Sequence, residues 1–98
     1  MAAGRLRLGQ LVSSRAGRDC GQRYLVVGKT GDRFVLLADG DTRKMAAPKK
    51  KNIKHLIFHP AVAEEIENKL TAGEGVTDEE IRLALTALVE EQGFSLPT

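Results

Sequence analysis

Short apolar runs separated by turn signals constrain the fold of this chain most, and they occupy its first sixty residues. Residues 24–27 (Tyr-Leu-Val-Val) and 34–38 (Phe-Val-Leu-Leu-Ala) are β-rich runs of strand length. Residues 29–32 (Lys-Thr-Gly-Asp) lie between them and are typical of a hairpin turn. The Asp39-Gly40 pair that follows suits the positive φ angles of tight hairpins. The pattern therefore predicts two adjacent strands joined by a tight turn.

Three further strands complete the prediction for this half of the chain. The first contains Leu8, Leu11 and Val12 and ends at the polar loop of residues 13–19. A fourth strand is expected near residues 42–45, and a fifth at residues 53–58, after a lysine-rich loop. Five short strands with tight turns in about fifty residues predict a small closed β-barrel.

The spacing of apolar residues changes to a helical period at Pro60. Val62, Ile66 and Leu70 fall on one helical stripe, Pro60 suits the first turn, and Gly73 suits the end. A second helix is expected after the capping box of Thr77 and Glu80, with an end at Gly93. Its apolar face would consist of Ile81, Ala84, Leu85 and Leu88. Two short helices bury little surface by themselves, so both should dock on the barrel or on a partner.

The predicted fold class is mainly β with an α appendage. A barrel is expected over residues 6–58 and an acidic helical hairpin over residues 60–93. The charges divide at the same point. The 98 residues carry a net charge of +2, but residues 1–59 contain 13 Lys/Arg and 4 Asp/Glu, a net +9. Residues 60–98 contain 2 Lys/Arg and 9 Asp/Glu, a net −7. Such a split indicates a basic part that meets a polyanion, or else a solvated dipolar surface.

Composition also limits where the chain can act. No apolar run approaches the roughly twenty residues needed to span a bilayer, and residues 1–6 lack the apolar core of a signal peptide. Cys20, the single cysteine, cannot form an internal disulfide and leaves no zinc framework. We therefore expect a cytoplasmic protein with no membrane partner, monomeric when free.

An ordered series of short segments within residues 9–56 resembles a KOW domain. The likeness runs through residues 9–12 (Gly-Gln-Leu-Val), 16–27, 33–40 and 51–56 (Lys-Asn-Ile-Lys-His-Leu). It is most similar to the large-subunit ribosomal KOW proteins of archaea and eukaryotes, of the L-fourteen-e kind. The resemblance implies an SH3-like barrel that contacts ribosomal RNA through loop and strand-edge residues. The acidic tail differs from the basic extensions of many ribosomal proteins, so a bacterial stand-alone member that associates with the ribosome or another RNA fits at least as well.

Two basic segments are the candidate RNA-binding residues. Arginine pairs with phosphate in a bidentate fork, glycines at 17 and 21 let a backbone approach a ligand closely, and lysines read phosphate as point charges. The resemblance implies that the first loop faces RNA. The alternative is that the glycines serve the turns and the basic side chains are only solvated. The candidates are Arg15, Arg18 and Arg23 in the first segment, and Arg43, Lys44, Lys49, Lys50, Lys51, Lys54 and His55 in the second.

Other chemistry finds little support in the sequence. Tyr24 and Phe34 are expected to pack in or beside the barrel core rather than to stack on bases. His55 and His59 lack a third metal ligand, and neither a catalytic triad nor a phosphate-binding glycine loop can be assembled. We therefore expect no metal, no cofactor and no enzymatic activity.

The sequence leaves two functions of different class. The first is an RNA-binding protein that contacts structured ribosomal RNA. The second is a protein-interaction adaptor of the transcription or translation machinery, because KOW-type barrels also occur in transcription elongation factors. In the second function the acidic helices would dock a basic partner. The same acidic helices could also be plain solvated faces, or could fold back on the barrel and compete with RNA.

Overall fold

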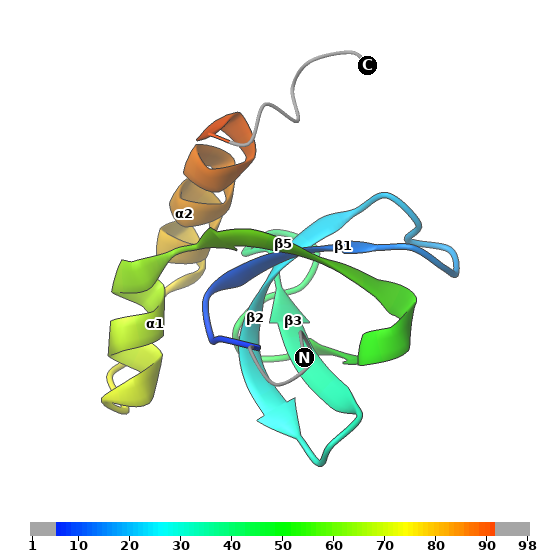
Figure 1. Ribbon diagram of the computed structural model, residues 1–98. Coiled ribbons are helices and arrows are strands. Elements are labelled where there is room, and N and C mark those ends of the chain that lie inside the picture. The colour runs from blue at the N-terminus through cyan, green and yellow to red at the C-terminus, as the bar shows by residue number, and fades with distance from the viewer. Residues whose placement is uncertain (1–5, 92–98) are drawn as a thin grey trace.

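The computed structural model describes residues 6–91 and consists of a five-stranded antiparallel sheet with two helices on one side (Figure 1). The strands are arranged in the order β4-β3-β2-β1-β5. A short 3-10 helix, η2, connects the two edge strands β4 and β5. The elements are β1 (Gln10–Ser14), β2 (Arg23–Thr30), β3 (Phe34–Ala38), β4 (Lys49–Asn52), η2 (Ile53–His55), β5 (Leu56–Val62), α1 (Glu64–Thr71) and α2 (Asp78–Glu91).

The sheet is apolar on both of its faces. Alternate residues of a strand point to opposite faces. Val12, Val26 and Val35 belong to one buried cluster, whereas Leu11 and Leu25, their neighbours in β1 and β2, belong to another. Strands buried on both faces read as nearly continuous apolar runs, which is the pattern seen in β2 and β3.

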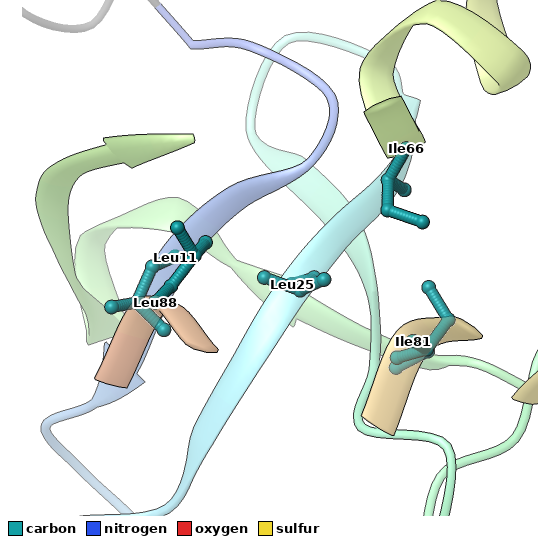
Figure 2. Packing of buried hydrophobic residues seen from close by; sticks show 6 residues of the cluster. Leu11, Leu25, Ile66, Ile81 and Leu88 are labelled. Carbon is teal, nitrogen blue, oxygen red and sulfur yellow. The ribbon is translucent and has the colours of Figure 1, made fainter. Parts of the chain in front are cut away.

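The two helices cover the second of these faces. Ile66 of α1 and Ile81 and Leu88 of α2 pack in the same cluster as Leu11 and Leu25 (Figure 2). Burying such a side chain is worth about 1.5–3 kcal/mol. The helices are therefore docked on the sheet, which is one of the two arrangements expected from the sequence.

The predicted helix boundaries are partly confirmed. The backbone N–H of Glu80 donates to Thr77 Oγ1 (3.1 Å), and the backbone N–H of Thr77 donates to Glu80 Oε1 (2.9 Å), so the capping box is present. Helix α1 ends before Gly73, whose φ of +78° is easily adopted only by glycine. Gly93, the predicted end of the second helix, lies outside the described residues.

The loop of residues 39–48 is fixed against the start of α2. Arg82 Nη1 donates to the carbonyl oxygen of Gly40 (2.7 Å), and the backbone N–H of Met45 donates to Asp78 Oδ1 (2.7 Å). Gly40 has a φ of +78°, and a Cβ atom placed there would overlap the backbone oxygen of Asp78. The absence of a side chain at position 40 therefore allows this contact between loop and helix.

The predicted fourth strand near residues 42–45 is wrong, because that segment is a loop. Its backbone groups bond outside the sheet: Asp39 Oδ1 accepts from the N–H groups of Asp41 and Arg43 (2.8 Å each). The fourth strand is instead β4, the predicted lysine loop, which pairs with β3 from Phe34↔Asn52 to Leu37↔Lys49. Lysines are common on exposed edge strands, where they discourage pairing with another chain.

The other strand boundaries are also shifted. Leu8 precedes β1, which includes Ser13 and Ser14, and β2 extends through Lys29 and Thr30 of the predicted turn. Residues 53–55 form η2, in which Asn52 Oδ1 accepts from the N–H of Lys54 (2.9 Å), so the last strand begins at Leu56.

Pro60 and Val62 lie in β5 and not in a helix. β5 is an edge strand, where a residue without an N–H is tolerated. The register with β1 shifts between Gln10 and Val12, and the side-chain amide of Gln10 donates to the carbonyl oxygen of His59 (2.9 Å). Despite these shifts, the predicted fold class is confirmed: a small β domain with C-terminal helices, consistent with an SH3-like fold. The closed barrel expected from the sequence is a sheet with two edges within residues 6–91, because β4 and β5 are joined by η2 and are not paired with each other. Within residues 6–91, no helix combines the length and apolar character needed to cross a membrane.

Candidate nucleic-acid interface

The loop between β1 and β2 is held by a hydrogen-bond network centred on Asp19. The Asp19 carboxylate accepts from Lys51 Nζ (2.7 Å), Ser14 Oγ (2.8 Å) and the Tyr24 hydroxyl (2.9 Å). Lys51 and Ser14 bond Oδ1, whereas Tyr24 bonds Oδ2, and Lys49 Nζ lies 3.4 Å from Oδ2. Asp19 therefore links β1, β2 and β4 to the loop that carries Arg15 and Arg18.

The ammonium group of Lys51 is used within the protein. It donates to Asp19 Oδ1 (2.7 Å), Ser14 Oγ (2.9 Å) and the carbonyl oxygen of Ala16 (2.9 Å). A lysine has three N–H donors, and the Lys51 side chain is only 10% exposed. Of the predicted RNA-binding residues, Lys51 thus stands out as a residue that supports the loop from inside.

The network shifts the pKa values of its members. Burial alone would raise the pKa of Asp19, but hydrogen bonds from Lys51, Ser14 and Tyr24, together with the charge of Lys49, bring it well below its ordinary value. Burial and the hydrogen bond to Asp19 raise the pKa of Tyr24 to about 12. Asp19 is therefore a stable carboxylate, and Tyr24 a neutral hydrogen-bond donor, at physiological pH.

The backbone of this loop turns at two glycines with positive φ, Gly17 (+90°) and Gly21 (+92°). The N–H of Gly21 donates to the carbonyl oxygen of Ser14 (2.8 Å), and the N–H of Ser14 donates to that of Gln22 (2.9 Å). These bonds close the base of the loop. The arginines Arg15 and Arg18 are exposed on it.

The structure brings part of the second predicted segment beside this loop. The backbone N–H of Arg15 donates to the carbonyl oxygen of His55 (2.9 Å), so η2 and the loop are neighbours. Lys54 and His55 are exposed. We call Arg15, Arg18, Lys54 and His55 together the basic loop surface. Figure 1 shows the β1–β2 loop on the side of the molecule away from α1 and α2.

Lys49 lies beside the loop network, and the other candidates lie elsewhere on the sheet and its loops. Arg43 and Lys44 are exposed on the loop that docks against α2. Lys50 is exposed on β4, with its ammonium 4.7 Å from the centre of the Phe34 ring, and Lys49 is paired with Asp19. Arg23 is half-buried at the start of β2, opposite Ser13 of β1.

A second polar cluster lies on the strands beside Arg23. Ser13 Oγ is 2.8 Å from His59 Nε2. Burial and the positive charge of Arg23 lower the pKa of His59. A neutral His59 ring can accept a hydrogen bond from the Ser13 hydroxyl or donate one to it, and it adds no charge to this surface. This cluster gives Arg23 a different setting from that of Arg15 and Arg18.

Sequence reasoning missed the residues at the centre of the site. The sequence predicts Ser14 and Asp19 only as parts of a polar loop, whereas the structure places Ser14 in β1 and Asp19 at the centre of the network. The available signal was a single carboxylate inside a strongly basic stretch, a position that favours an internal partner for one of the lysines. Tyr24 is buried, as expected, at 3% exposure. Within residues 6–91, His, Cys, Asp and Glu side chains nowhere gather in a group of three or more that could hold a metal.

The fold and its site define the chain as a small SH3-like β domain with covering helices and a basic loop surface. No family model matches the sequence. Over 54 residues it is 43% identical to a protein of Bacillus subtilis (strain 168) that bears the name "Putative ribosome-binding protein YbzG". The match covers 55% of this chain and 73% of the relative. The chain therefore belongs to the family of YbzG.

Proposed function

We propose that this protein is a ribosome-associated RNA-binding protein of the cytoplasm that acts by binding and not by catalysis. Its basic loop surface would contact phosphates of structured ribosomal RNA, with the sheet acting as a KOW-type barrel. The observation that carries the proposal is the relationship to a protein named for ribosome binding, combined with exposed Arg15, Arg18 and Lys54 on one surface.

The Asp19 network supports this proposal by fixing the loop. Ordering a flexible loop on binding costs conformational entropy, whereas a loop already held in shape avoids that cost. Lys51 neutralises Asp19 from inside the protein, at 2.7 Å, which leaves the positive charges of Arg15 and Arg18 available on the outside. Arginine suits this task because its planar guanidinium group can pair with two phosphate oxygens.

The ribosome test is co-sedimentation of the purified protein with ribosomal particles, with and without RNase treatment. We expect the protein to sediment with intact particles and to leave them after RNase digestion. Association that survives in an RNA-free complex would contradict the RNA-binding role and support a protein-interaction adaptor.

Replacing Arg18 with glutamine should weaken this association severalfold without unfolding the protein, because the side chain is exposed. Each lost phosphate contact should also make the log–log salt slope shallower by roughly 0.7–0.9. Lys29→Gln removes the same charge from an exposed position of β2 and should leave the slope unchanged. Filter binding to ribosomal RNA across about 50–200 mM salt measures both quantities. Equal effects of the two substitutions would show that RNA affinity depends only on the net charge of the protein and would contradict a specific role for the basic loop surface.

A further inference from the structure

The helices α1 and α2 leave a groove between them that is separate from the basic loop surface. Its apolar part includes Leu83, Ala84 and Ala87 of α2 and Ile66 of α1. The hollow continues past Ala84 and Ala87 toward Val62 and Leu88. Leu83 is 64% exposed, the highest value among the large apolar side chains of the described chain. The groove therefore presents apolar surface that the fold itself does not cover.

Helix α2 is apolar over a wider arc than its docking requires. Ile81 and Leu88 already bury the face that packs on the sheet (Figure 2). Leu83 and Ala87 are four residues apart, so they form a second, neighbouring stripe. Both are exposed in this structure. A stripe of this kind fits a partner that inserts apolar side chains between the helices.

The charge at the rim of the groove is strongly negative. Glu64, Glu65, Glu80 and Glu91 line it. Lys69 is the one basic residue among the described lining residues, and it is ion-paired with Glu80. The rim repels the phosphates of RNA and attracts cationic groups. Exposed ion pairs add little affinity each, so apolar contacts would hold the partner and the carboxylates would select it.

We propose that this groove binds a basic polypeptide segment whose apolar side chains fill the space over Ala84 and Ala87. Lysines or arginines of that segment would face Glu64, Glu65 and Glu91. Such a partner complements the groove in both shape and charge. The groove lies on the helices, whereas the β1–β2 loop extends on the side of the molecule away from them (Figure 1). A basic segment and an RNA could therefore be bound at the same time.

The test uses the full chain and a fluorescein-labelled amphipathic peptide of lysine and leucine. Its controls are a glutamate-for-lysine peptide and a serine-for-leucine peptide. Ala87→Arg places a long cationic side chain in the groove, and Thr86→Arg places the same side chain at the adjacent exposed position. We expect saturable binding that falls at least tenfold in Ala87→Arg and less than twofold in Thr86→Arg, by fluorescence anisotropy.

A second matched pair tests the rim without filling the groove. Glu91 lines the groove, whereas its neighbour Glu90 is exposed outside it. Glu91→Lys should weaken peptide binding severalfold more than Glu90→Lys. Circular dichroism should show that all four variants keep the helical content of the wild type. Equal effects within each pair, or equal binding of the serine-for-leucine peptide, would overturn the proposal.

Two further measurements separate this proposal from other outcomes. Affinity for ribosomal RNA should be the same in wild type and Ala87→Arg. The RNA-binding proposal and the peptide-binding proposal can therefore be contradicted separately. Sedimentation equilibrium of the unliganded protein tests whether a second copy occupies the groove. A dimer that Ala87→Arg dissociates would replace the basic segment with self-association as the explanation.

Discussion

Three consecutive lysines occupy three different environments in this protein. Lys49 pairs with Asp19 at 3.4 Å, Lys50 lies over the Phe34 ring, and Lys51 is enclosed by Asp19, Ser14 and Ala16. The alternation of side chains along β4 produces this difference, because Lys49 and Lys51 point to one face and Lys50 to the other. A run that resembles a uniform basic patch thus contains one residue devoted to structure.

The enclosed position of Lys51 predicts a stability effect. Lys51→Met keeps the length of the side chain and removes the ammonium, leaving Asp19 as a mostly buried carboxylate without its closest cation. We expect a loss of about 2–3 kcal/mol in the free energy of unfolding. Lys54→Met, at an exposed position, should change it by less than about 0.5 kcal/mol. Urea denaturation measures both, and similar values would mean that Lys51 is not structural.

The Asp19 carboxylate predicts how stability depends on pH. Its pKa in the folded protein lies below its ordinary value of 3.8, so the unfolded chain binds a proton first as the pH falls. The stabilisation is therefore complete above about pH 5 and is lost as the pH drops through the ordinary value toward the folded one. Asp19→Asn should be less stable than wild type at neutral pH and should lose less on acidification.

Thermal melts from about pH 7 to pH 2 measure this difference. Asp39, Glu67 and Glu80, whose pKa values are also lowered, should leave a residual slope in Asp19→Asn. Asp32→Asn, at an exposed position of the β2–β3 turn, is the control for the loss of one carboxylate. An Asp19→Asn curve parallel to the wild-type curve would contradict the role given to Asp19.

At the scale of elements, Gly40 joins the sheet to α2. Gly40→Ala must adopt a positive φ and would also place its Cβ against the backbone oxygen of Asp78 and Cγ of Arg82. Gly31→Ala must also adopt a positive φ, at +73°, but no atom lies within 4 Å of the position its Cβ would take. We expect Gly31→Ala to cost about 1 kcal/mol and Gly40→Ala at least about 2 kcal/mol more. Denaturant midpoints compare the two, and equal costs would mean that the loop and helix separate easily.

The positions of the strands show which parts of the fold can be predicted from the sequence. The prediction for residues 34–38 matches β3 without a shift because a five-residue apolar run with turn residues on both sides is too short for a typical helix and suits a buried strand. The fourth strand is misplaced for two reasons. The Asp39 carboxylate bonds the nearby N–H groups of Asp41 and Arg43 and turns the backbone locally. The N–H of Met45 donates to Asp78, a partner that only the tertiary fold brings close. Pro60 suggested a helix start because its place at an edge of the sheet depends on the strand order.

At the scale of the whole molecule, the acidic helices and the basic β1–β2 loop lie apart, whereas Arg7 pairs with Glu67 of α1 and Arg43 and Lys44 lie on the loop that docks against α2. The helices with their acidic residues lie on one side of the sheet, and the β1–β2 loop extends on the other (Figure 1). The position of the first basic loop could be predicted from sequence, whereas the role of Asp19 could not, since Ser14, Tyr24 and Lys51 meet it only after folding.

The double-sided sheet limits how this protein can be taken apart. Without α1 and α2, the side chains of Leu11, Leu25 and Ala38, all at 0% exposure in the whole chain, would face water across the centre of the sheet. A fragment ending before Ala63 should therefore self-associate or adsorb to other proteins. Pull-down experiments with such a fragment would therefore detect non-specific hydrophobic association and not specific binding. Partner searches should use the intact chain with single substitutions, because truncation would create a binding surface that the protein does not have.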